Sequence, residues 1–187
     1  MDYFTADWHI GEAQTPNTHS FLRPRPTEVM VEEWLLHCSE VLKPEDRLIC
    51  LGDMILELEH FAALGALPKC QTKLLVLGDK EHRHNHLALL EKAQAAGFTA
   101  VVNTWTLPIA GRDWFLSHKP SDCFGQALPA LCGHVHGIWR SSQMPNGQPI
   151  INVGIDAWGG LVSEECITHQ YTAVTKHYDT DASPARW

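Results

Sequence analysis

Five short apolar segments of this chain each end in a small group of acidic or histidine residues, and this repeated feature constrains the fold more than any other. The groups are Asp7-Trp8-His9, Gly52-Asp53, Gly78-Asp79, Ser117-His118 and Gly133-His134-Val135-His136. Short apolar runs that stop at turn residues are typical of buried strands. In layered α/β proteins, functional side chains gather where the strands end. We therefore expect the five groups to meet at one edge of a sheet.

Helical patterns separate the first strands. Apolar residues recur at helical spacing over residues 28–42, and helices are also indicated over residues 56–64 and 84–96. Two later stretches are typical of β-hairpins, and the second turns at Asn146-Gly147, where we expect a type I′ turn. We find no internal repeat or linker. The sequence therefore predicts one domain over residues 1–178 and a flexible tail over residues 179–187.

The composition excludes several classes of protein. Hydrophobic residues make up 44% of the 187 residues and charged residues 19%, which excludes an intrinsically disordered chain. No apolar run reaches the ~18 residues that a membrane span requires. The net charge of −8 argues against a surface that binds duplex DNA. Because there is no basic leader segment and no Cys-x-x-Cys pair, we expect reduced thiols and a cytoplasmic protein.

The polar groups at the strand ends together supply three carboxylates and four imidazoles. These are Asp7, His9, Asp53, Asp79, His118, His134 and His136. Oxygen and imidazole ligands suit manganese, iron, zinc and nickel. The set exceeds the needs of one ion, whereas two ions that share a bridging carboxylate would use all of it. We therefore expect two divalent metal ions, with Mn²⁺ favoured and Fe, Zn or Ni as the alternatives.

In this order, the motifs resemble those of the calcineurin-like metallophosphoesterase superfamily. That family has D-x-H, G-D, G-N-H-D/E, a single H and then G-H-x-H. Residues 151–156, Ile-Asn-Val-Gly-Ile-Asp, are also similar to the N-V-G-x-D segment of its small bacterial and phage members. The resemblance implies an α/β fold, a four-layer αββα sandwich of two mixed β-sheets flanked by helices. It also implies a phosphoesterase that uses metal-activated water.

The resemblance further implies that three residues hold each ion and that one residue bridges both. The first ion would be held by Asp7, His9 and His136, the second by Asp79, His118 and His134, and the bridge would be Asp53. A histidine must be neutral to bind a metal ion, so we expect activity to fall at acid pH.

The third motif departs from the family pattern. The family has Gly-Asn-His-Asp/Glu, whereas this chain has Gly78-Asp79-Lys80-Glu81 followed by His82. Asp79 still offers an oxygen ligand, but it makes the centre less positive. Lys80 replaces a histidine that, in the family, contacts the phosphate and helps the leaving group depart. Lysine is a poor proton donor near neutral pH, so Lys80 and His82 are both candidate catalytic residues. These changes favour a phosphodiester with a good leaving group over a phosphomonoester.

Two arginines lie in the loop that precedes the first predicted helix. Arg23 and Arg25 are candidate contacts to the substrate phosphate, because arginine matches phosphate geometry. The alternative is that both are solvated loop arginines.

The expected partner is a phosphate ester, which includes nucleotides and nucleic-acid ends, and no membrane partner is expected. The alternative function is a metal-binding scaffold that has this fold and has lost turnover.

Overall fold

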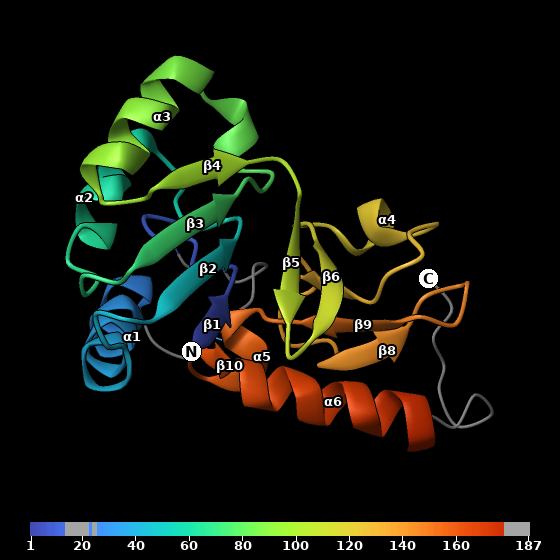
Figure 1. Ribbon diagram of the computed structural model, residues 1–187. Helices are drawn as coiled ribbons and strands as arrows, with labels where there is room; N and C mark the ends of the chain where they lie inside the picture. Colours follow the sequence, from blue (N-terminus) through green and yellow to red (C-terminus); the bar gives the residue numbers. More distant parts are fainter. Residues whose placement is uncertain (14–22, 24–25, 178–187) are drawn as a thin grey trace.

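The computed structural model describes residues 1–13, 23 and 26–177, which form two five-stranded sheets (Figure 1). The first sheet has the strand order β10-β1-β2-β3-β4. Its strands are β1 (Asp2–Thr5), β2 (Arg47–Leu51), β3 (Thr72–Val76), β4 (Ala100–Val102) and β10 (Val162–Ser163). Strands β1 to β4 are parallel, and β10 pairs antiparallel with β1. The predicted tail, residues 179–187, lies outside the described residues.

The second sheet has the strand order β5-β6-β7-β9-β8. Its strands are β5 (Trp105–Ile109), β6 (Arg112–Leu116), β7 (Ala130–Cys132), β8 (Ser141–Gln143) and β9 (Pro149–Asn152). The central strands β6, β7 and β9 are parallel, and β5 and β8 pair antiparallel at the edges. Both sheets are therefore mixed, as the family resemblance implied.

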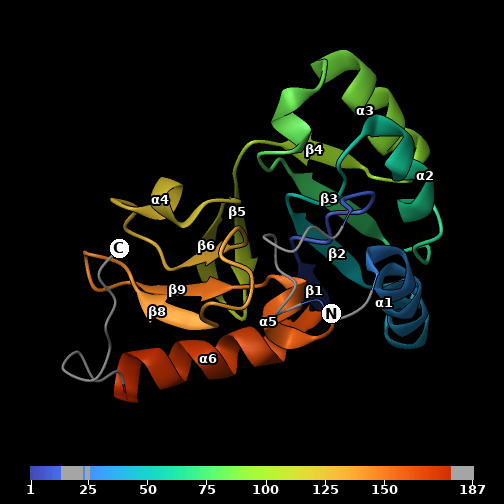
Figure 2. The ribbon, with the colours of Figure 1, turned by 180° about the vertical axis from the view of Figure 1, so that it is seen from behind.

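The helices cover the sheets and close the sandwich. They are α1 (Thr27–Val41), α2 (Phe61–Leu64), α3 (His86–Ala95), α4 (Pro120–Cys123), α5 (Ile155–Trp158) and α6 (Glu164–His177), with short 3₁₀ helices η1 (Leu58–His60) and η2 (Glu81–Arg83). Helices α1, α2 and α3 pack on the outer face of the first sheet, and α6 runs along the second sheet (Figures 1 and 2). This arrangement confirms the predicted α/β class. None of the helices among the described residues has the length and apolar character needed to cross a membrane.

Strand β2 illustrates why the first sheet forms from almost continuous apolar runs. Successive side chains of a strand point to opposite faces. Leu48 and Cys50 pack against the helices, whereas Ile49 and Leu51 pack into the core between the two sheets. Because both faces of a parallel sheet are covered, no polar position is needed along the strand. Because both faces of the strand are buried, polar side chains gather where the strand ends.

The turn between β8 and β9 forms at the predicted residues but is not of the predicted type. A type I′ turn requires positive φ at both central residues. Among these loop residues only Gly147 has positive φ, at 81°. The Gly147 N–H donates to Met144 O at 2.8 Å, and Met144 N–H donates to Gln148 O at 2.8 Å. Pro145 therefore starts an ordinary type I turn, and Gly147 supplies the left-handed residue that follows it.

We predict that the inter-sheet core dominates stability. The substitution Leu51→Ala removes a side chain that is fully buried between the sheets. It should lower the free energy of unfolding by about 2–5 kcal/mol, measured by urea denaturation, because a cavity is left behind. The matched control is Leu87→Ala on α3, whose side chain is 66% exposed, and it should change stability by no more than about 0.5 kcal/mol. Equal effects of the two substitutions would contradict this.

Candidate metal centre

The seven predicted ligands come together at the rim where β1, β2, β3, β6 and β7 end. Three groups of side chains have ligand atoms that all lie within 4.8 Å of one another. The groups are Asp7, His9 and His136; Asp79, His118 and His134; and Asp7, Asp53 and His118. The first two groups match the two ligand sets that the family resemblance implied. The third group connects them through Asp53.

Left-handed backbone conformations are concentrated at this rim. Among the described non-glycine residues, positive φ occurs at five of the seven predicted ligands and at one hairpin residue. The residues are Asp7 (62°), His9 (51°), Asp53 (51°), His134 (72°), His136 (49°) and Ala110 (48°). Such a conformation costs about 1–2 kcal/mol for a residue with a side chain. The loops are therefore shaped by the direction their side chains must take rather than by local stability.

Asp53 lies between the two groups. Its Oδ2 is 3.6 Å from His9 Nε2, and its Oδ1 is 3.5 Å from His118 Nε2. The backbone N–H of Lys80 donates to Oδ1 at 2.8 Å and holds the carboxylate. Gly78 allows this close packing, since a Cβ there would lie 2.3 Å from Asp53 N and 2.4 Å from Oδ1. This position suits a carboxylate that contacts two ions.

His118 provides a test of whether the site fits a metal ion. Its ring is 3% exposed, and its Nδ1 lies 2.8 Å from Leu51 O, to which it can donate. Its Nε2 is buried and has no hydrogen-bond partner among the described residues. Burial also lowers the pKa of His118, so the ring is neutral near pH 7 and Nε2 carries a lone pair. A buried nitrogen acceptor without a donor is costly, and a metal ion would satisfy it.

Asp7 is a buried carboxylate beside the other candidate ligands. Its side chain is fully buried, and both carboxylate oxygens accept from His134 N–H, at 3.0 and 2.9 Å. Burial nevertheless raises the pKa of Asp7 to about 7. A divalent cation beside this carboxylate would offset the cost of burying its charge. The donor set therefore fits hard or borderline divalent ions.

The His136 ring is oriented by Asp156, which forms a buried ion pair with Arg23. The sequence did not indicate this pair. His136 Nδ1 lies 2.6 Å from Asp156 Oδ2, and Arg23 also donates to both carboxylate oxygens of Asp156, at 2.9 Å each. Burial alone would raise the pKa of Asp156, but the hydrogen bonds from His136 and Arg23 lower it to about 2. A partner at Nδ1 directs Nε2 of the imidazole towards the site.

The position of Arg23 differs from our expectation of a substrate contact. Its side chain is 3% exposed, and besides Asp156 its guanidinium contacts the backbone oxygens of Asp7 and Trp8. Arg23 therefore connects the segment after β1 with Asp156 of α5 beneath the site. Its guanidinium is already paired with that buried carboxylate. Arg25, the other predicted contact, lies outside the described residues.

Glu81 is a second residue that we did not single out, and it fixes the loop that carries Asp53. Its carboxylate is buried and accepts four backbone N–H groups. The donors are Asp53 (2.8 Å), Met54 (2.7 Å), Ile55 (3.2 Å) and Gly78 (2.9 Å). Burial raises the pKa of Glu81, and the nearby Asp53 carboxylate acts in the same direction. The signal available in the sequence was the acidic residue that closes the third motif.

The ammonium group of Lys80 is paired with the carboxylate of Glu12. Its Nζ is 3.1 Å from Glu12 Oε1, and the other oxygen of Glu12 is 2.5 Å from His9 Nδ1. The hydrogen bond with His9 is the main reason that the pKa of Glu12 falls to about 2. Burial lowers the pKa of His9, so the neutral ring can donate from Nδ1 to Glu12. Lys80 thus supports the partner of a candidate ligand.

The second ligand group is more exposed than the first. Asp79 and His134 are 36% and 43% exposed, and Asp79 Oδ2 is 3.6 Å from His134 Nδ1. Lys119, which sequence reasoning missed, places Nζ 2.6 Å from Asp79 Oδ1. Partial burial acts to raise the pKa of Asp79, but the contact with Lys119 outweighs it and the pKa is lowered. His82 lines a cavity beside this group, together with Asp79 and Lys119.

We predict that Glu81→Gln weakens both the fold and metal binding. A glutamine side chain replaces one acceptor oxygen by a donor, so backbone N–H groups of the Asp53 loop lose their acceptor. Each such group costs about 1–3 kcal/mol, which urea denaturation should detect. Metal content after dialysis should also fall, because Asp53 loses its support. The control is Glu91→Gln, an exposed position on α3. Wild-type stability and metal content in the Glu81 variant would refute the role given to Glu81.

Comparisons with known proteins identify the fold. No family model and no curated protein matches this chain. One similar solved structure is a protein of unknown function, AQ665 from Aquifex aeolicus, with a TM-score of 0.63 and 22% identity over 90% of this chain and 98% of that chain. Another is described as a novel archaeal phosphodiesterase, with a TM-score of 0.54 and 15% identity over 82% of each chain. The chain therefore shares the fold of these two solved structures, and its two mixed sheets flanked by helices are the architecture that the family resemblance led us to expect.

Proposed function

We propose that this protein is a phosphoesterase that depends on two divalent metal ions. The observation that carries this proposal is the buried Nε2 of His118, which has no hydrogen-bond partner among the described residues and lies 3.5 Å from Asp53. Such an atom is expected at a metal site and is costly elsewhere. The two ligand groups that share the neighbourhood of Asp53 support two ions rather than one.

Each ion has a proposed set of ligands. Asp7, His9 and His136 would hold the first ion, Asp79, His118 and His134 the second, and Asp53 would contact both. The absence of cysteine from the set and the mixture of carboxylate and imidazole favour Mn²⁺, with Fe, Zn or Ni as alternatives. When bound, two such ions supply positive charge for the phosphate group and activate a water molecule for attack on phosphorus.

The chain's own residues have three tasks in this reaction. Asp156 and Glu12 accept from the Nδ1 atoms of His136 and His9, and thereby fix the rings with Nε2 towards the centre. Glu81 fixes the loop of Asp53. His82 donates the proton that the leaving alcohol needs, because it lines the cavity beside the second ligand group. Lys80 is the weaker candidate, since its ammonium is paired with Glu12.

The proposed substrate is a phosphodiester. The archaeal protein that shares this fold is described as a phosphodiesterase. Asp79 makes the centre less positive than asparagine would, which suits an ester with one negative charge better than one with two. Lys119 offsets that charge at the exposed rim, where water screens it. We place the reaction in the cytoplasm, because all six cysteines are free thiols.

The first test is metal content. Elemental analysis of protein loaded with Mn²⁺ should give about two ions per chain, and Asp53→Asn should reduce the content of both sites, since only a bridging ligand contacts both ions. The same substitution should abolish hydrolysis of bis-p-nitrophenyl phosphate. Asp113→Asn, at an exposed position on β6, is the control and should retain both properties. Two ions and normal turnover in the Asp53 variant would exclude Asp53 as the bridge.

The same experiment separates the enzyme from the scaffold alternative. A wild-type protein that holds two ions and hydrolyses neither diesters nor monoesters would favour a metal-binding scaffold. One tightly held ion, with His118 and His134 free of metal, would contradict the dinuclear centre.

The second test concerns His82. A general acid is typically worth about 10²–10⁴ in rate, and only where the leaving group needs a proton. His82→Ala should therefore slow hydrolysis of alkyl esters strongly and that of nitrophenyl esters little. His86→Ala, which removes an exposed imidazole at the start of α3, should change neither rate. If the His82 substitution leaves the dependence on leaving group unaltered, His82 is not the proton donor.

A further inference from the structure

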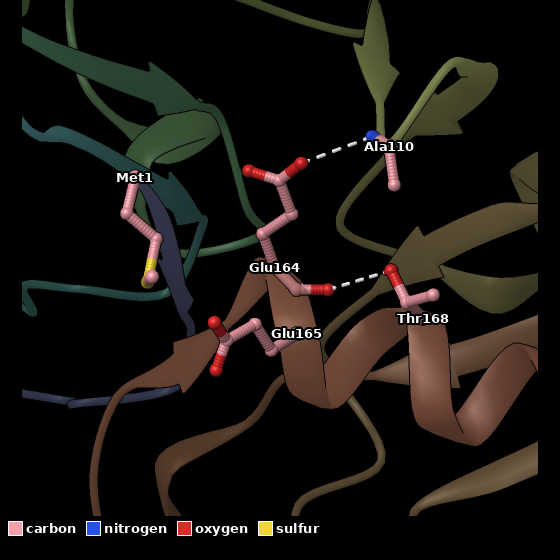
Figure 3. A pocket seen from close by; sticks show the side chains of 5 residues that line it. All are labelled: Met1, Ala110, Glu164, Glu165 and Thr168. Carbon is pink, nitrogen blue, oxygen red and sulfur yellow. Dashed lines mark hydrogen bonds between the residues drawn. The ribbon is translucent and has the colours of Figure 1, made fainter.

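Two cavities differ sharply in what they could bind. One, of about 580 Å³, lies between the N-terminus, the β5–β6 hairpin and the start of α6 (Figure 3). Glu164 uses its carboxylate for the N–H of Ala110, and the Thr168 hydroxyl donates to the Glu164 backbone oxygen. Only Glu165 remains for a ligand, and a single acidic side chain at a helix start is no site. The cavity therefore gives no indication of a ligand.

The other cavity, of about 260 Å³, opens directly onto the candidate metal centre. Asp79 and His118 of the second ligand group form part of its wall. The rest comes from the segment after β3, from η2, from the β4–β5 connection, from the segment between β6 and α4 and from α4 itself. A phosphate ester bound at the metal centre would have to place one of its substituents in this cavity or next to it.

Apart from Leu77, the side chains of this wall are polar and offer both donors and acceptors. They are His82, Asn103, Thr104, Lys119 and Asp122. The side chains of His82, Asn103 and Thr104 make no hydrogen bond to any described residue. An apolar substituent would cover these groups without satisfying them. A second anionic group would approach Asp79 and Asp122. Hydroxyl groups both donate and accept, so they match this mixture.

The cavity has room for a small alcohol, and its lining argues against a base. Since a water molecule occupies ~30 Å³ in the liquid, the cavity has room for about eight or nine waters. That is enough for a glycerol or a pentose ring. The wall also offers no aromatic ring other than the imidazoles of His82 and His118 for stacking a base.

We propose that this cavity binds the alcohol part of the substrate and that this alcohol is a small polyol or sugar. The proposal rests on the phosphoesterase function and adds the class of the leaving group. Asn103 and Thr104 would bond its hydroxyls, and Lys119 would face its acceptor oxygens. Hydrolysis breaks the P–O bond to this alcohol, water provides the new oxygen on phosphorus, and the alcohol leaves with a proton.

The test compares two diesters that differ only in hydroxyl groups, glyceryl methyl phosphate and propyl methyl phosphate. With the Mn²⁺-loaded full chain, kcat/KM for release of glycerol should exceed that for release of propanol by about tenfold or more, which is the worth of one or two net hydrogen bonds. Thr104→Val and Asn103→Leu should reduce this preference to about threefold or less. The ratio does not depend on how much metal each preparation holds.

The matched control is Thr106→Val on β5, an exposed threonine that lies outside the cavity wall, and it should keep the full preference. Hydrolysis of bis-p-nitrophenyl phosphate with equal rates for the two alkyl diesters would overturn the polyol pocket and leave the proposed function standing. A preference that survives both substitutions would also overturn it.

If no ester is hydrolysed, the proposed function fails. The affinities of the two diesters then test whether the cavity binds a polyol. Calorimetry with the same two diesters should still give about tenfold tighter binding of the glyceryl ester, again reduced by Thr104→Val. Equal binding of the two esters, or tighter binding that Thr104→Val leaves unchanged, would overturn the polyol pocket as well.

Discussion

The candidate metal centre depends on the buried carboxylate of Glu81. Four backbone N–H groups from the loops after β2 and β3 converge on its two oxygens, at 2.7–3.2 Å. Neither loop could otherwise satisfy these donors, because both turn sharply where the strands end. One side chain thus sets the distance between the two loops and the direction of Asp53. The pKa of Glu81 is raised by its burial, which indicates that the fold tolerates an electrostatic cost to keep this link.

The other loops of the centre also have strained backbone, and contacts from neighbouring side chains hold it in place. Five of the predicted ligands have positive φ, a conformation that persists only where neighbouring contacts enforce it. Asn152 is an example, because its side-chain amide donates to the backbone oxygens of His136 and Trp139, at 2.6 and 2.7 Å, and accepts from Gly154 N–H at 2.8 Å. Asp156, four residues on, contacts the imidazole of the same histidine. One short segment therefore fixes both the backbone and the ring of His136.

The sequence indicated which candidate ligands come together better than it indicated the residues that support them, and the reason is physical. A ligand such as Asp53 follows an apolar strand directly, so local sequence marks it. Asp156 is 133 residues away from Arg23 and 20 from His136, and a contact of that kind is fixed only by the tertiary fold. We expected Arg23 at the substrate because nothing in the sequence around it indicates its buried partner, Asp156. The division of the strands into two sheets came from the family resemblance, and apolar periodicity alone does not provide it.

The altered third motif is internally balanced, which argues against a decayed site. Compared with the family pattern, the motif gains one negative charge at Asp79 and a fixed positive charge at Lys80. Each has an opposite charge within reach, because Lys119 Nζ is 2.6 Å from Asp79 and Glu12 Oε1 is 3.1 Å from Lys80 Nζ. Glu12 also contacts His9, so the Lys80 pair is connected to the first ligand group. A site that had drifted after losing its function would have no reason to keep partners for both new charges or to keep Asp7 buried beside them. The altered motif therefore fits the proposed centre, in which each added charge has a partner and the candidate ligands lie together.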